Sequence, residues 1–155
     1  HLQTNKVRQV IGKTTLIHSV DSLRLIEALQ AESERCGIVT DILLEVNAAR
    51  EASKFGFFPE ELSDIVQLLS KTRNLRVCGL MTVAPFTENS EDNRKYFRQI
   101  RQIAVDISAK NIDNISMDTL SMGMTGDFEV AIEEGATMVR VGTGIFGERD
   151  YRLEQ

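Results

Sequence analysis

The last apolar segment of the chain carries residue types that can bind a phosphate group. Residues 138–147 read Met-Val-Arg-Val-Gly-Thr-Gly-Ile-Phe-Gly, so a short apolar stretch runs directly into glycines with a threonine between them. Glycine allows successive backbone N–H groups to approach an anion, and a threonine hydroxyl can donate one further hydrogen bond. Gly142 and Thr143 are therefore candidate phosphate ligands, although this segment alone is also typical of a strand followed by an ordinary turn.

Arg140 lies inside the same stretch, between two valines. A guanidinium in such a run must either point out of the sheet layer or be buried against an acceptor, because an unpaired buried charge is very costly. We therefore expect Arg140 to be either a surface residue or a buried residue with acceptors around it.

A second candidate phosphate-binding segment precedes a short helix that we expect to begin near Thr125. Ser121, Met122 and Gly123 lie in this segment, which we interpret as a linker between a strand and that helix. The free N–H groups and the positive dipole end of a helix N-terminus favour a dianionic phosphate. The alternative is that Thr125 merely caps the helix and Asp127 complements its dipole. The presence of two such segments favours the binding site over this alternative.

Other side chains could contribute to a pocket, and each also has an ordinary structural role. Lys54 follows an expected strand and could attack an aldehyde, but pairing with Glu51 or Glu45 is its expected role. His18 and Asn47 stand at the ends of expected strands, where a pocket residue and a hydrogen-bonded structural residue give the same signal. Methionine packs well against aromatic surfaces, so three methionines could form an apolar wall beside a cofactor or part of the core: Met81, Met122 and Met124.

Five apolar runs of strand length alternate with segments of helical periodicity, and these elements must position the candidate residues. The expected strands are Leu16–Val20, Ile42–Asn47, Leu75–Val83, Met117–Leu120 and Val139–Val141. The helices are expected from about Ser22, from Pro59, over roughly Ser90–Ala109, and from near Thr125 to Gly135. We expect Phe128, Ala131 and Ile132 to form the buried side of the last helix.

Strands that alternate with helices predict parallel pairing through right-handed crossovers, and so an α/β fold. Two architectures fit this order, a doubly wound open sheet and a (β/α)8 barrel. A complete barrel takes about 250 residues, whereas this chain has 155. The chain is therefore interpreted as a small open-sheet domain or as the C-terminal part of a barrel. It begins at His1 rather than at a methionine, and we expect the whole protein to start earlier.

The composition is that of an ordinary soluble globular protein, with 42% hydrophobic and 26% charged residues. A net charge of −5 argues against nucleic acid or an anionic membrane surface as the main partner. No apolar run approaches the roughly 18 to 20 residues that span a membrane. Cys36 and Cys78 form no CxxC motif and have no metal-ligand spacing to the two histidines, so we predict no metal site and a reduced, cytoplasmic setting.

Seven segments of the chain, in order from the N-terminus to Tyr151, carry a family pattern, and the last two are the most specific. The segments are His1–Lys6 (HLQTNK), His18–Asp21 (HSVD), Glu45–Asn47 (EVN), Ser53–Gly56 (SKFG), Gly79–Met81 (GLM), Leu120–Asp127 (LSMGMTGD) and Val139–Gly147 (VRVGTGIFG). Together they resemble the pyridoxal phosphate homeostasis proteins, which are single-domain relatives of the alanine racemase barrel.

This resemblance implies that residues 1–155 form one partial domain, the C-terminal five β/α units of a fold-type III (β/α)8 (TIM) barrel. It also implies that pyridoxal 5′-phosphate (PLP) is the cofactor, bound at the C-terminal ends of the strands. The residues that it assigns to PLP are Ser121, Met122, Gly123, Arg140, Gly142 and Thr143. Arg140 aligns with an arginine that faces the pyridine nitrogen in related racemases and keeps that nitrogen unprotonated, which suits a carrier better than a versatile catalyst.

The family is thought to buffer and deliver PLP without a reaction of its own, so the expected partners are PLP and the PLP-dependent apo-enzymes that receive it. The resemblance assigns no catalytic residue here, because the lysine that forms the family's Schiff base lies on the first barrel strand, and that part of the pattern is absent. We expect the chain to keep most of the phosphate site and to lose the covalent anchor. The alternatives are a PLP-dependent amino-acid racemase-like enzyme and a barrel that binds another phosphorylated metabolite.

Overall fold

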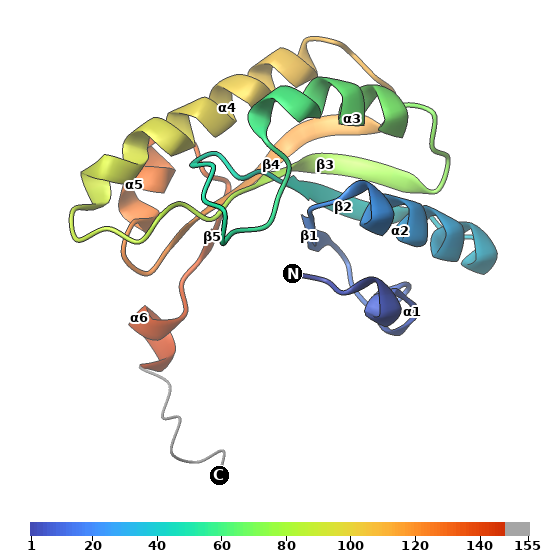
Figure 1. Cartoon of the computed structure of the whole chain (residues 1–155), viewed down its shortest axis with the longest axis horizontal. Coiled ribbons are helices and arrows are strands. Elements are labelled where there is room, and N and C mark those ends of the chain that lie inside the picture. Colours follow the sequence, from blue (N-terminus) through green and yellow to red (C-terminus); the bar gives the residue numbers. More distant parts are fainter. Residues whose placement is uncertain (148–155) are drawn as a thin grey trace.

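A computed structural model describes residues 1–147 of the chain. Its centre is a curved sheet of five strands, all parallel, in the spatial order β1-β2-β3-β4-β5 (Figure 1). The strands are β1 (Ile17–Val20), β2 (Thr40–Glu45), β3 (Leu75–Met81), β4 (Ile115–Met124) and β5 (Met138–Arg140). Because the spatial order follows the chain order without a reversal, the sheet is half of a barrel and not a doubly wound sheet, whose strand order changes direction.

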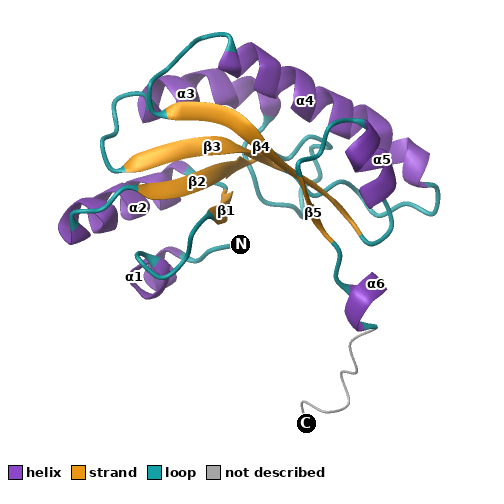
Figure 2. Ribbon diagram, turned by 180° about the vertical axis from the view of Figure 1, so that it is seen from behind, coloured by secondary structure: helices purple, strands orange, loops and turns teal. Residues whose placement is uncertain are grey.

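Helices connect the strands and cover the convex face of the sheet, while the N-terminus lies beneath its other face (Figures 1 and 2). These helices are α2 (Leu23–Cys36), α3 (Leu62–Leu69), α4 (Arg94–Ser108) and α5 (Phe128–Glu133), while α1 (Val7–Val10) precedes β1 and α6 (Thr143–Phe146) follows β5. Helix α2 begins where Ser22 caps it by accepting a hydrogen bond from the N–H of Leu25. No helix of residues 1–147 is long and apolar enough to cross a bilayer.

The two faces of the sheet differ because side chains alternate along each strand. Ile42, Leu44 and Val46 belong to the apolar core that the helices cover. Glu45, between the last two, therefore points to the inner, concave face, and the strand register places equivalent residues beside it. We call these residues the inner row: Asp21, Glu45, Met81 and Ser121.

The structure confirms the expected α/β class and the five strands, but it corrects the sequence prediction around β4. The segment from Ser121 to Thr125 was expected to be a linker, whereas β4 continues to Met124. It does so because Ser121 pairs with Met138 and Met124 with Arg140, so that β5 extends the ladder. Pairing with a distant strand leaves no local signal in the sequence.

Helix α5 also differs from its prediction. It begins at Phe128 rather than near Thr125, and residues 125–127 form a turn ahead of it. Ala131 is buried as expected, but Ile132 is 52% exposed and Val130 takes the buried position instead. The buried side of this short helix therefore comprises Val130 and Ala131.

Candidate functional site

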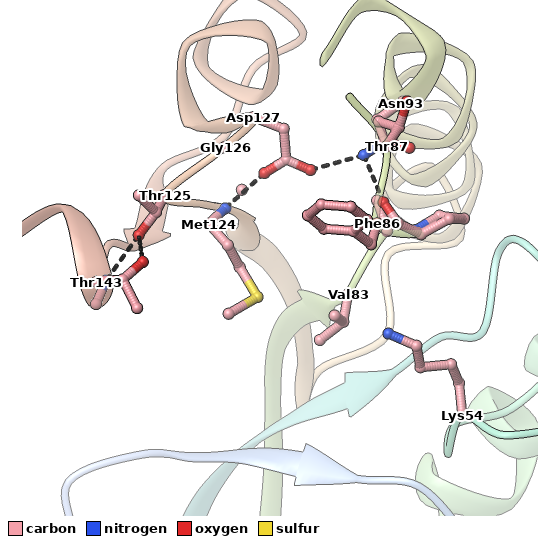
Figure 3. Close-up of a pocket in the computed structure, with 14 residues that line it drawn as sticks. Lys54, Val83, Phe86, Thr87, Asn93, Met124, Thr125, Gly126, Asp127 and Thr143 are labelled. Atoms are coloured by element: carbon pink, nitrogen blue, oxygen red, sulfur yellow. Dashed lines mark hydrogen bonds between the residues drawn. The ribbon is translucent and has the colours of Figure 1, made fainter. Parts of the chain in front are cut away.

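A pocket of about 420 Å³ lies at the C-terminal ends of β3, β4 and β5 (Figure 3). Parallel barrels bind their ligands at this end of the strands. One wall is apolar and comes from Val83, Phe86 and Met124, and the opposite wall comes from the turns that follow β4 and β5. Lys54 reaches the pocket from the loop after β2, and Figure 3 shows its ammonium directed toward the apolar wall.

The hydroxyl of Thr125 joins the two turns. The N–H groups of Gly142 and Gly144 donate to this oxygen over 3.3 Å and 3.1 Å, and the hydroxyl of Thr143 lies 3.1 Å from it. Thr125 therefore does not cap α5, which overturns the structural alternative that the sequence had suggested for it. Within residues 1–147, the N–H groups of Gly126 and Thr143 donate to no acceptor, so both are available to an anion.

Two glycines in these turns are required by close packing. A Cβ on Gly123 would lie 2.7 Å from Cβ of Ala131 and 2.9 Å from Cα of Phe128, and its φ is +95°. A Cβ on Gly144 would lie 2.9 Å from Cγ2 of Thr125. A Cβ on Gly142 would meet nothing within 4 Å, so its hydrogen faces open space beside the pocket. Of these glycines, Gly142 is the one whose small size leaves room for a ligand.

Asp127 holds the turn after β4 in place. Its carboxylate accepts hydrogen bonds from the N–H of Met124, over 2.7 Å, and from the amide of Asn93, over 2.9 Å. The same amide donates to the carbonyl of Pro85, so the turn is tied to the loop that carries Phe86 (Figure 3). The carboxylate thus has a structural function in addition to any effect of its charge at α5.

Arg140 is half-buried and bonded to acceptors, which is close to one of the two arrangements that its position in the sequence allowed. Nη1 donates to the carbonyl and the hydroxyl of Ser121 over 2.8 Å and 2.7 Å, and Nη2 donates to the carbonyl of Thr82 over 2.8 Å. Burial lowers the pKa of Arg140, and the negative charges of Glu45 and Asp127 oppose that shift. The guanidinium is therefore held in one orientation by Ser121 and Thr82.

The structure brings together only part of the residue set that the sequence had assigned. Gly123, Gly142 and Thr143 line the pocket, whereas Arg140 does not line it and bonds to Ser121, two residues before Gly123. Ser121 and Met122 have no exposed surface and do not line it. Ser121 supports Arg140, whereas Met122 packs in the core beneath the helices.

Thr125 and Gly144 were not among the assigned residues. Thr125 stands two residues beyond Gly123, and Gly144 stands beside Thr143 in the glycine-rich segment. The spacing of glycines with threonines was therefore the available signal. The hydrogen bonds between the two segments depend on the register of β4 against β5, and residue types along the chain do not specify that register.

The opposite end of the inner row is acidic. Glu45 and Asp21 are each 8% exposed, and the register places them side by side. Oδ2 of Asp21 contacts Nδ1 of His1. The other oxygen of Asp21, Oδ1, and Oε2 of Glu45 are both buried without a hydrogen-bond partner among residues 1–147. Burial raises the pKa of Glu45, and the charge of Asp21 raises it further.

The structure also shows the contacts of three other candidates, Asn47, Lys54 and His18. Asn47 braces the loop after β2, because its side chain bonds to the backbone of Glu51 and of Lys54. The expected ion pair of Lys54 with Glu51 or Glu45 is wrong: Lys54 forms no ion pair with any described carboxylate. His18 bonds to Ser121 on the inner face.

The donor set of the pocket fits a phosphate ester that carries a flat, apolar ring. Hydroxyl and amide donors at Thr125, Gly126 and Thr143 match phosphate oxygens, and the methionine and aromatic wall matches a ring. Among residues 1–147 no group of three or more histidine, cysteine, aspartate or glutamate side chains is placed to hold a metal ion.

Comparison with known proteins gives a consistent result. Residues 2–150 match the family described as alanine racemase, N-terminal domain. A pyridoxal phosphate homeostasis protein of Aquifex aeolicus is 47% identical over 97% of this chain. PipY of Synechococcus elongatus, solved with PLP bound, superimposes with a TM-score of 0.83 at 32% identity, over 95% of this chain and 68% of that one. An alanine racemase of Clostridium difficile has a TM-score of 0.75 at 13% identity, over 96% of this chain and 40% of the racemase, and shows only that the fold is shared.

The chain spans about two thirds of the length of the curated relatives that it matches, with 65% of the Aquifex protein and 63% of a Pseudomonas aeruginosa relative covered. What those proteins do as whole molecules is therefore carried to this chain only as a proposal.

Proposed function

The chain belongs to the pyridoxal phosphate homeostasis proteins within the alanine racemase N-terminal domain family, and on that premise we propose that it binds PLP and takes part in PLP homeostasis. The observation that carries this proposal is the contact of Thr125 with Gly142 and Gly144, which places the donors of two turns around one point of the pocket. Arg140, held by Ser121 and Thr82, would supply a positive charge near the site.

Each residue has a role in this proposal. The hydroxyls of Thr125 and Thr143 and the N–H groups of Gly126 and Thr143 would hold the phosphate. Arg140 would face the ring nitrogen and keep it unprotonated, and Met124 would pack against the ring. Ser121 would act through Arg140, and Met122, which packs in the core, would not touch the ligand. Bound PLP would supply an aldehyde that condenses with amines.

We further propose that the protein stores and hands on the cofactor, with PLP-dependent apo-enzymes as recipients, and does not turn over a substrate. The ionisable side chains that line the pocket are Lys54 and Asp127. Asp127 is committed to the N–H of Met124 and to Asn93, which leaves it poorly placed to move a substrate proton. The names of the relatives support storage over catalysis.

The first test is a PLP titration, compared with pyridoxal and with inorganic phosphate. If the two turns bind the phosphate, PLP binds at least about 30-fold more tightly than pyridoxal, because charge-assisted bonds to the phosphate are lost in pyridoxal. PLP must also bind more tightly than inorganic phosphate. Equal affinity for PLP and phosphate would mean that the site takes phosphorylated metabolites in general and would overturn the proposal.

Two variants assign the binding to this pocket. Thr125→Val keeps the shape but removes the shared hydroxyl, and it is expected to weaken PLP binding about tenfold. Thr14→Val, on the exposed connection before β1, is the matched control and should bind as the unsubstituted chain does. If Thr125→Val bound PLP with unchanged affinity, PLP would have to bind at another place on the protein.

Borohydride reduction of the PLP complex, followed by peptide mass spectrometry, tests for a covalent anchor. For residues 1–155 we expect no labelled lysine at stoichiometric PLP, because the family resemblance assigns the Schiff base to none of the lysines in this sequence. Labelling of Lys54 would replace this expectation with a covalent mode through the pocket lysine. Exchange of the α-proton of an amino acid in deuterated water, dependent on added PLP, would instead support the racemase-like alternative.

A further inference from the structure

A series of hydrogen-bonded side chains crosses the inner face of the sheet and ends at Arg140. The hydroxyl of Ser121 on β4 lies 3.1 Å from Nδ1 of His18 on β1 and accepts a 2.7 Å bond from Nη1 of Arg140 on β5. Strands β1 and β4 are not neighbours in the sheet, so the contact spans the concave surface. Ser121, at its centre, is completely buried.

The direction of the bonds in this chain follows from the number of protons available. Arg140 is a donor only, so Ser121 Oγ is the acceptor in that bond. The Ser121 hydroxyl proton then needs an acceptor of its own, because a buried donor without a partner is costly. Nδ1 of His18 is the acceptor within reach among the described residues, and it can accept only if it carries no proton. His18 is therefore neutral, with its proton on Nε2.

Burial and the nearest positive charge favour the same state of His18. Burial and the positive charge of Arg140 hold the pKa of His18 below its ordinary value of 6.5. From the neighbouring elements, Glu45 on β2 and Asp21 after β1 face the same surface, and Asp21 is already in contact with His1. Protonation of Nδ1 would direct two donors from two cations at the single oxygen of Ser121.

We propose that neutral His18 is a positioning residue that orients Arg140 through the Ser121 hydroxyl and so sets the affinity of the site for PLP. This inference rests on the proposed function for its effect on PLP, but the hydrogen-bonded chain itself does not. When His18 takes up a proton, Ser121 loses its acceptor and Arg140 loses part of its support. The affinity for PLP is therefore expected to fall as the pH drops through the lowered pKa of His18.

The chain of bonds is tested first without PLP, by ¹⁵N NMR of the imidazoles. The protein has only two histidines, His1 and His18, so a single variant assigns both signals. We expect His18 to have the Nε2–H tautomer and to titrate below 6.5, and we expect its titration to move in Ser121→Ala. A protonated Nδ1 in the neutral form, or a titration that Ser121→Ala leaves unchanged, would overturn the inference.

The effect on PLP is then measured with two substitutions of His18. His18→Phe keeps a ring but removes the acceptor and is expected to weaken PLP binding about tenfold at neutral pH. His18→Asn places an amide oxygen near the position of Nδ1, and it should bind PLP within about twofold of the unsubstituted chain. Because PLP itself titrates in the same range, the decisive readout is the extra loss of affinity between pH 7.5 and 5.5, which His18→Asn should lack.

The two proposals fail in different ways. If no PLP binds but the NMR result is as expected, the proposed function fails while the orientation of Arg140 by His18 stands. If PLP binds and both His18 variants bind equally well across the pH range, the positioning role is overturned while the proposed function stands. Where His18→Phe does not fold, the Asn variant and the Ser121→Ala titration still decide the question.

Discussion

The two ends of the inner row differ in whether their polar groups have hydrogen-bond partners. At the β4–β5 end, three hydrogen bonds hold Arg140, and the hydroxyl of Thr125 meets two backbone N–H groups. At the β1–β2 end, Asp21 and Glu45 each keep a buried oxygen without a partner among residues 1–147. At the first end, hydrogen-bond donors are already positioned for an anion. At the second end, carboxylate oxygens are buried without donors, which costs free energy. The comparison predicts that disturbing the first end destabilises the protein and that neutralising the second stabilises it.

The largest expected effect is that of Gly123→Ala at the β4–β5 end. The new Cβ would lie within 3 Å of two atoms of α5, at a φ that alanine rarely adopts, so unfolding should become easier by about 3 kcal/mol. Gly142→Ala is the matched control, since its Cβ meets open space, and it should change stability by less than about 0.5 kcal/mol. Urea unfolding measures both. Equal effects at the two positions would show that Gly123 is not required by close packing any more than Gly142 is.

The next effect is that of Arg140→Lys, which keeps the charge but loses the planar fork. An ammonium can reach some of the three acceptors now bound by the guanidinium, but not all of them. We expect a loss of about 2 kcal/mol in the free energy of unfolding, because a buried carbonyl is left without its donor. If the lysine variant were as stable as the unsubstituted chain, Arg140 would matter at this end only through its charge.

Glu45→Gln should have the opposite sign. The pKa of Glu45 is raised in the folded protein, so its ionisation favours the unfolded state, and its contribution to stability is lost as the pH rises above about 4.5. The amide also offers an N–H to the unpaired oxygen of its neighbour Asp21. We expect a gain of about 1 kcal/mol at pH 7 and none at pH 4.

The measurement for Glu45 is the difference between two stability curves over pH 4 to 8. Exposed carboxylates elsewhere, such as Glu60 and Glu91, have a lowered pKa because arginines bond to them, and they shape both curves alike. The positive charges of Arg140, Lys54 and the N-terminal amine oppose the shift at Glu45. A variant that is less stable than the parent at pH 7 would show that these charges dominate at the acidic end.

The smallest effect is expected for Lys54→Gln. Lys54 lines the pocket but forms no ion pair with a described carboxylate. The free energy of unfolding should therefore change by less than about 0.5 kcal/mol. A loss above about 1 kcal/mol would mean that its charge is needed to offset Glu45, and the two ends would then be coupled across the pocket.

Much of the fold followed from local patterns, because strand length, helical periodicity and capping residues are encoded within a few neighbouring residues. Ser22 begins α2, and the apolar run after Leu75 forms β3, as expected. The prediction failed where pairing over distance decides, as in the extension of β4 through Met124. The same limit applied to the site: the glycines and threonines were visible in the sequence, but the contact between Thr125 and Gly144 was not.

Residue types and their order along the chain were sufficient for the α/β class, the family and two of the segments that line the pocket. Three features came only from the folded structure: Ser121 supports Arg140 rather than lining the pocket, Thr125 joins the two turns, and Asp21 and Glu45 are neighbours with unpaired oxygens. Hydrogen bonds and burial depend on the register of neighbouring strands and on the packing around them. That is settled by packing of the whole sheet, and no single segment carries the information.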